Sequence, residues 1–409
     1  MSASAASPPP VPGRRRAFTA IFVTILLDLI GFGMILPQLP YFAQELHATP
    51  AMVGLLFSSY SLAQFLFAPL LGRLSDRIGR RPVLLVSICG SAAAHLIFAF
   101  AGSFWTLVLA RSLAGVAAAN YSIAQAYMAD VSTAEDRSKA MGLVGAAFGI
   151  GFVLGPAFGG FLALLHPRAA PLAASALSAA NFLIALSWLP ESLPPQVREL
   201  SRSRPWIDPS GLGRMWRNVP LRGLMLLFFL VMFCFSLFEA TLALYCQSRF
   251  GFGRTEISYL FAYVGVVLVV VQGALLGRLV RRFGERRLIL WGIFLMAAGL
   301  AVLPSAPTVW QLAACLALLA VGSGVHNPST MGLLSRLTNE GSQGGTIGLS
   351  RSFGALARTL GPATGTWIFG AVGAAWPFWT AGGLMLFALV IAWGVLSRAA
   401  PALSASPPC

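Results

Sequence analysis

Long apolar segments separated by short polar ones constrain this chain more than any other feature of its sequence. A helix that crosses a bilayer needs about 20 mainly apolar residues. The chain is 57% hydrophobic and 10% charged, whereas soluble domains carry about 25% charged residues, so we predict an all-α membrane protein. The segments that we assign as twelve transmembrane helices are 17–42, 50–71, 82–101, 104–129, 140–163, 170–190, 222–247, 255–277, 287–304, 308–333, 343–370 and 374–397. Those at 104–129 and 343–370 contain charges and are the weakest by hydropathy.

Two stretches of the first half recur in the second half at nearly the same spacing. GRLSDRIGRRPVLL begins at Gly72, and GRLVRRFGERRLIL begins at Gly277, 205 residues later. GPAFGG begins at Gly155, and GPATGT begins at Gly361, 206 residues later. Two independent matches at one offset indicate an internal duplication. The duplication predicts two pseudo-symmetric bundles of six helices each.

Basic residues are distributed unevenly over the two sides of the predicted helices. Of 28 Lys and Arg, 22 fall on segments assigned to one side, three on the opposite loops and three inside predicted helices. Because cytoplasmic loops carry the excess of Lys and Arg, both termini are expected in the cytoplasm and the chain in the cell's inner membrane. The net charge of +15 then reflects topology and attraction to anionic lipids. We expect no nucleic-acid partner.

The longest polar connection, at about 191–221, is rich in Pro and Arg and falls near the middle of the chain. We interpret it as a cytoplasmic linker between a first bundle at 17–190 and a second at 222–397. Residues 1–16 and 398–409 are interpreted as disordered cytoplasmic tails. Parallel six-helix repeats predict a binding site near the bilayer midplane, between bundles that rock against each other.

The loop GRLSDRIGRRP places one carboxylate among four basic side chains. Gly72 and Gly79 permit tight turns, and Asp76 can meet a helix N-terminus or an Arg. The basic residues of this loop that are candidates for the same functional role as Asp76 are Arg77, Arg80 and Arg81. The loop is either a conformational latch or only a basic segment that fixes topology.

The fifth predicted helix carries small residues at regular spacing. Gly151, Gly155 and Gly159 lie four residues apart and share one helix face, which permits close helix packing. Pro156 removes a backbone hydrogen bond and should bend the helix. The full pattern is Gly142, Gly151, Gly155, Pro156, Gly159 and Gly160.

Four segments together resemble the major facilitator superfamily, and within it the twelve-span drug/proton antiporters typified by the tetracycline exporters. They are the loop at 72–82, DLIGFGMILPQLP at 28–40, LVLARSLAGVAAA at 107–119 and the glycine pattern that begins at Gly142. The resemblance covers residues 17–397 and implies the major facilitator fold.

The resemblance also implies roles for particular residues. Asp76 and its arginines would latch the two bundles together in the outward-facing state. The helix with the glycine pattern would lie at the interface of the bundles and mark exchangers rather than uptake carriers, and Arg111 would take part in proton transfer. Because the second copy of the loop has Arg281 in place of Asp76 and Glu285 in place of Arg80, an equivalent latch is not expected there.

Charged residues inside a membrane are costly and usually paired, so they are strong functional candidates. Asp28 lies about 16 Å from the inner surface by helix rise. Its carboxyl could bind and release a proton during transport, or it could act only as a hydrogen-bond acceptor. Arg111 lies roughly 10 Å deep from the outer side and could orient Asp28 or hold an anionic substrate group.

Three further candidates lie in the predicted helices of the second half. Glu239 and Arg358 should both lie roughly 23–25 Å from the inner surface, so we predict that they face each other or share a polar cluster, in a functional or a structural role. In the tenth helix, Pro328 is expected to interrupt the segment GSGVHNPST. His326 in this segment could carry a proton near neutral pH, although a lone membrane histidine is more often neutral and hydrogen-bonded.

These features predict a secondary-active, proton-coupled antiporter that exports small amphipathic, drug-like compounds, such as tetracycline-like molecules, by alternating access. The proton gradient would drive transport, and we expect no cofactor and no metal. The sequence contains no GxxxxGK[ST], HExxH or GxSxG, so we do not expect an enzyme. The expected partners are a small-molecule substrate, protons and the lipid bilayer, and the chain is expected to be monomeric. The alternatives are a proton-coupled uptake carrier for a metabolite, or a transporter-like sensor or scaffold.

Overall fold

The computed structural model describes residues 14–118, 120–132, 137–202, 219–336 and 343–404. All regular elements in these ranges are helices. They are α1 (Arg14–Ile35), α2 (Leu39–Glu45), α3 (Pro50–Ile78), α4 (Arg80–Ala99), α5 (Phe104–Ala117), α6 (Asn120–Asp130), α7 (Arg137–Leu165), α8 (Ala169–Trp188), α9 (Pro195–Arg202), α11 (Val219–Phe250), α12 (Arg254–Val270), α13 (Leu276–Val302), α14 (Val309–Arg336), α15 (Gln343–Ala371) and α16 (Trp376–Ser404).

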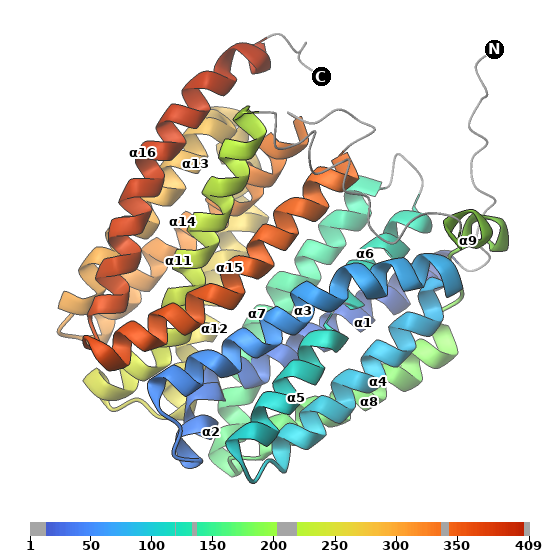
Figure 1. Ribbon diagram of the computed structural model, residues 1–409, viewed down its shortest axis with the longest axis horizontal. Coiled ribbons are helices and arrows are strands. Elements are labelled where there is room, and N and C mark those ends of the chain that lie inside the picture. The colour runs from blue at the N-terminus through green and yellow to red at the C-terminus, as the bar shows by residue number, and fades with distance from the viewer. Residues whose placement is uncertain (1–13, 119, 133–136, 203–218, 337–342, 405–409) are drawn as a thin grey trace.

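The helices form two bundles that follow the order of the chain. Figure 1 shows α1 to α8 on the right and below, and α11 to α16 on the left. In the first bundle α1 packs against α7 and α8, and in the second α13 packs against α14 and α16. Two helix pairs join the bundles, α3 with α15 and α7 with α12. The bundles lie closest at the lower end of the view and splay apart toward the end where α1 begins and α16 ends (Figure 1).

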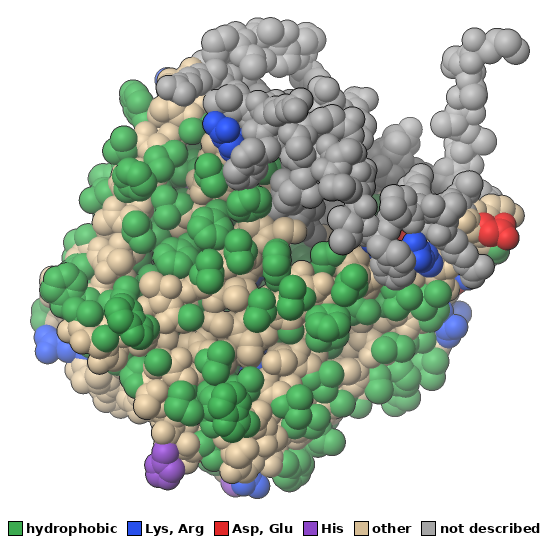
Figure 2. Space-filling view, in the orientation of Figure 1, with side chains coloured by type: hydrophobic (Ala, Val, Ile, Leu, Met, Phe, Trp, Pro, Cys, Tyr) green, Lys and Arg blue, Asp and Glu red, His purple; other side chains and the backbone are tan. Residues whose placement is uncertain are grey.

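Ten segments among the described residues are long and apolar enough to cross a membrane. One of them, Arg254–Ser305, is 52 residues long, more than twice what one crossing requires. Its backbone leaves helical geometry at Gly284, and α15 is not among the ten. If Arg254–Ser305 is taken as two helices and α15 is added, the count agrees with the twelve predicted. Apolar side chains are spread over the face that Figure 2 shows, and the charged side chains visible there are few and lie near its edges, as expected of a surface facing lipid.

The sequence repeat is also a repeat of backbone conformation. Gly79, between α3 and α4, has φ 115° and ψ 154°, and Gly284, 205 residues later, has φ 75° and ψ 157°. Positive φ with extended ψ is open essentially to glycine alone. Gly79 therefore turns the chain from α3 into α4, and Gly284 kinks α13 at the equivalent place of the second bundle.

Three helix predictions need correction. The predicted helix 104–129 is divided between α5, which ends at Ala117, and α6, which begins at Asn120. The first predicted helix, 17–42, is divided: α1 ends at Ile35 and a 3-10 turn over Leu36–Gln38 leads into α2. Pro37 and Pro40 lie in this segment, and neither can donate the backbone hydrogen bond that a continuous helix needs. The expected interruption at Pro328 is absent, because α14 continues through it. One missing hydrogen bond is tolerated where neighbouring helices hold the segment. Here Gly322 packs so closely on Gly292 of α13 that a Cβ atom at Gly322 would collide with the Gly292 carbonyl.

Candidate functional site

Polar side chains from four helices of the first bundle meet around Asp28 of α1. Asn120 of α6 donates a hydrogen bond from Nδ2 to the Asp28 Oδ2 at 3.2 Å. Arg111 of α5 is 3% exposed, and its guanidinium carbon lies 4.3 Å from the centre of the Tyr60 ring of α3. It also lies 5.8 Å from the centre of the Phe32 ring. The guanidinium therefore rests on aromatic faces, which attract a cation.

Asp28 and Arg111 line one small cavity together with Tyr60, Ser91 and His95. Its volume is about 10 Å³, close to the room that one water molecule needs. Although they share this cavity, the two charged side chains form no ion pair or hydrogen bond with each other. Within the described part of the chain, Arg111 has no hydrogen-bond or ion-pair partner at all, and its buried Nε is unsatisfied. The predicted orientation of Asp28 by Arg111 is therefore not a direct contact in this conformation.

The second bundle contributes Glu239 of α11 and Arg358 of α15, two helices that pack along each other. The charge of Arg358 acts on the Glu239 carboxyl, and a polar cluster shared by the two side chains stays a prediction. The same charge also acts on Tyr60, together with that of Arg111. Tyr60 is thus under the influence of one arginine from each bundle.

His326 does not join this central group. It is fully buried in α14, beside Gly292 of α13, and its Nε2 lies 3.5 Å from the Thr330 hydroxyl. It is not among the residues around the Asp28 cavity. The structure therefore places His326 in helix packing within the second bundle, and proton transfer by His326 stays a prediction.

The loop that begins at Gly72 is held by contacts within the first bundle. Arg80 pairs with Asp76 at 2.5 Å and with Asp130, at the end of α6, at 3.2 Å. The Glu191 carboxylate accepts hydrogen bonds from the backbone N–H groups of Arg80 and Arg81 at 2.9 and 3.2 Å. This carboxylate caps the N-terminus of α4, where negative charge is favoured.

Among the described residues, Asp76, Arg80 and Arg81 form no hydrogen bond or ion pair with the second bundle. The latch between the bundles therefore stays a prediction for another conformation. Sequence reasoning missed Asp130 and Glu191. The available signal was that both are acidic residues at the ends of predicted helices on the side of this loop.

The glycine pattern of α7 divides between two partners. Gly155 packs so closely on Gly33 of α1 that a Cβ atom would collide with it, and the Gln38 amide donates to the Gly159 carbonyl at 2.8 Å. Gly160 instead faces Ser258 of α12, in the second bundle. The predicted close packing and interface position of this helix are both observed. Gly142, at the start of the pattern, has nothing within 4 Å of an added Cβ.

The end of the molecule opposite Gly79 holds contacts that cross from one bundle to the other. We call this the far end, and the end that carries Asp76 and Arg80 the basic end. Arg254 of α12 pairs with Glu45 of α2 at 2.5 Å, and its guanidinium carbon lies 4.1 Å from the centre of the Phe42 ring. The Tyr41 hydroxyl donates to the Phe252 carbonyl at 2.8 Å. The Gln44 amide donates to Gln247 Oε1 at 2.8 Å.

Helix packing closes the far end as well. Gly54 of α3 approaches Thr366 and Pro362 of α15 so closely that a Cβ would collide with both. The Ser58 hydroxyl donates to the Thr359 carbonyl at 2.5 Å. These contacts and the Arg254 group together seal the bundles against each other at this end.

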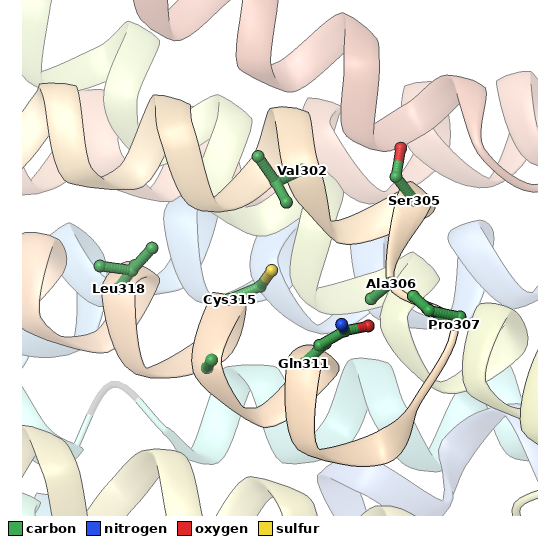
Figure 3. A pocket seen from close by; sticks show the side chains of 8 residues that line it. Val302, Ser305, Ala306, Pro307, Gln311, Cys315 and Leu318 are labelled. Carbon is green, nitrogen blue, oxygen red and sulfur yellow. The ribbon is translucent and has the colours of Figure 1, made fainter.

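The larger of the two cavities described here lies away from all of these residues. It has a volume of about 350 Å³ and opens between the end of α13 and the start of α14 (Figure 3). Val302, Ala306, Pro307, Cys315 and Leu318 make its lining mainly apolar. It has no charged side chain in its lining, so we do not assign it as the transport site.

The sequence profile of the Major Facilitator Superfamily matches residues 21–280 and 255–408. The chain belongs to the Major Facilitator Superfamily. The tetracycline resistance protein, class C, of Escherichia coli is 32% identical over 364 residues, which cover 88% of this chain and 91% of that protein. The class G protein of Vibrio anguillarum is 33% identical over 372 residues, 90% of this chain and 93% of that protein.

A solved structure supports the same assignment. The crystal structure of the human organic anion transporter MFSD10 (TETRAN) aligns with a TM-score of 0.72 and 28% identity, over 93% of this chain and all of that chain. The resemblance to major facilitator transporters inferred from the sequence motifs is therefore confirmed. The chain is a multi-pass membrane transporter protein of this family.

Proposed function

We propose that this protein is a proton-coupled antiporter that exports small amphipathic, drug-like compounds across the inner membrane. The observation that carries the proposal is the environment of Asp28. Its carboxyl lies inside the first bundle and accepts a hydrogen bond from the neutral Asn120 amide. Because no cation of the described residues pairs with it, it can gain and lose a proton without breaking an ion pair. The tetracycline resistance proteins, about 30% identical over most of the chain, support drug export.

Alternating access would proceed between two states that differ in which end is sealed. We assign the basic end to the cytoplasm because Lys and Arg are retained on that side, so the far end faces outward. Substrate would enter between the bundles from the cytoplasm while the far-end contacts hold. A proton from outside would later bind Asp28 and favour release, and the proton gradient would supply the energy without any cofactor.

The test uses purified protein in liposomes with an imposed pH gradient, and it records substrate and proton movement together. A panel of fluorescent amphipathic compounds should be transported against the direction of proton flow. Asp28→Asn should abolish gradient-driven transport, because the amide cannot carry a proton. Glu199→Gln is the matched control, since Glu199 is an exposed carboxylate on α9, and it should leave transport unchanged.

The other outcomes separate the remaining candidates. Substrate and protons moving in the same direction would identify an uptake carrier instead. If neither moves for any compound, a sensor or scaffold is the better description. If Asp28→Asn transports as well as the unmodified protein, Asp28 is not the proton carrier.

A further inference from the structure

Arg111 carries a buried charge that the described residues do not neutralise. An arginine cannot lose its proton in a protein, and an unpaired charge in a membrane interior is costly. The Tyr60 and Phe32 rings offset part of this cost, but an aromatic face attracts a guanidinium less strongly than an anion does. The N–H groups at the edge of the guanidinium form a fork that suits a carboxylate, and Nε–H has no partner.

Asp28, on the same cavity, presents the opposite charge when it is ionised. Its carboxyl accepts a hydrogen bond from the neutral Asn120 amide, and no cation of the described residues pairs with it, so it too lacks a counter-ion when ionised. Asp28 and Arg111 line the same cavity, but they form no ion pair with each other. A ligand that brings both an anionic and a cationic group would neutralise both.

This inference rests on the proposed function. If the ligand is exchanged for a proton, its charge decides whether it can bind when Asp28 is ionised and leave when Asp28 is protonated. A purely anionic ligand on Arg111 would be repelled by ionised Asp28, so it would bind together with the proton and not in exchange for it. A purely cationic ligand would suit ionised Asp28 but would add positive charge beside Arg111. A zwitterion satisfies Arg111 in every state and loses its cationic contact when Asp28 takes up a proton.

We propose that this cavity is the head-group site for amphipathic zwitterions, with the acidic group on Arg111 and the ammonium group on Asp28. The cavity has room for about one water in this conformation, so the head group binds by displacing the Tyr60 ring from Arg111. The apolar body of the ligand extends between the bundles.

The test uses three fluorescent probes that share one body and differ only in charge. Nε-dansyl-lysine is a zwitterion, its methyl ester is a cation and its Nα-acetyl derivative is an anion. Dissociation constants are measured with the purified full-length protein in lipid nanodiscs at a pH where Asp28 is ionised, judged from the pH dependence of binding. The zwitterion should bind at least about tenfold more tightly than either derivative, a difference that one charged hydrogen bond accounts for.

Two variants assign the charges. Arg111→Gln should remove the advantage of the zwitterion over the ester without weakening ester binding, because the cation no longer faces Arg111, and Asp28→Asn should remove its advantage over the acetyl derivative. Arg111→Lys, which keeps the charge without the fork, should restore part of the preference and shows that a loss in Arg111→Gln is not misfolding. Arg168→Gln, at an exposed arginine, is the matched control and should behave as the unmodified protein does.

Equal affinities for the three probes, no binding of any of them, or an Arg111→Gln effect that is the same for all three would overturn the inference. The failure of the proposed function is separate. If other compounds are exported with the gradient but zwitterions are not preferred, the proposed antiport function is supported and the proposed zwitterion site is wrong. A charge-selective binding pattern without proton exchange leaves the site standing and removes antiport.

Discussion

Both ends of the molecule are held by ion pairs and hydrogen bonds. At the far end these contacts join the two bundles, and at the basic end they lie within the first bundle. At the far end, Arg254 pairs with Glu45 across the two bundles, and Tyr41 reaches the Phe252 carbonyl of the second bundle. At the basic end, Arg80 pairs with Asp76 and Asp130, all of the first bundle. The far end is therefore sealed between the bundles, whereas these basic-end charges stabilise one bundle internally.

The difference indicates which contacts change during a transport cycle. Contacts inside a bundle can persist while the bundle moves as a rigid body, but contacts between bundles must break. We propose that the far-end group is one half of a pair of gates and that the predicted latch of Asp76 is the other. Three predictions test this division, in order from the largest expected effect to the smallest.

Gly54→Leu should have the largest effect, because a side chain at this position has no room against Thr366 and Pro362. Overpacking of this kind costs about 1–3 kcal/mol, so the far end should be wedged open and transport should fall by at least about tenfold. Gly383→Leu is the control, since an added Cβ there meets nothing within 4 Å. Equal fluxes for the two variants would show that α3 and α15 need not close at this end.

Asp76→Asn and Arg281→Asn compare equivalent positions of the two copies of the loop. Asp76 pairs with Arg80, whose side chain is only 11% exposed, whereas Arg281 is exposed and replaces the acidic residue. We expect Asp76→Asn to slow transport by about fivefold, near the upper range for a partly exposed pair, and Arg281→Asn to change it little. Initial rates in liposomes decide between them. A larger loss in Arg281→Asn would place the working latch in the second half.

Arg254→Gln should have a smaller effect, because the Glu45 side chain is 56% exposed and water screens the pair. The far end should open more easily, and transport should change by about two- to threefold. A double-mutant cycle with Glu45→Gln isolates the pair. Additive effects of the two changes would mean that the Phe42 ring, and not Glu45, holds Arg254.

Much of the fold follows from local properties of the sequence. Long apolar segments predict helices because lipid cannot satisfy backbone polar groups, and the repeat at Gly79 and Gly284 predicts the same turn in both halves. Asp28, Arg111 and Glu239 were found because charge is rare inside predicted helices. These inferences need no knowledge of how helices pack.

Other parts of the site depend on packing between distant segments. The partners of Arg80 and Arg254 lie at Asp130 and Glu45, and no local pattern joins such pairs. The sequence pattern also suggests a break at Pro328, but tertiary contacts with α13 keep α14 continuous. That Asp28 and Arg111 line one cavity without forming an ion pair follows only from the three-dimensional arrangement of α1 and α5.

The most direct test of the two-gate account is a pair of distances measured in the same protein. Spin labels at Ala51 and Val372 report on the far end, and labels at Ile78 and Arg282 report on the basic end; all four positions are exposed. Distance distributions are recorded by pulsed electron paramagnetic resonance in nanodiscs at high and low pH. The account predicts opposite changes, with the far-end distance lengthening as the basic-end distance shortens. Distances that stay fixed, or that lengthen together, would contradict it.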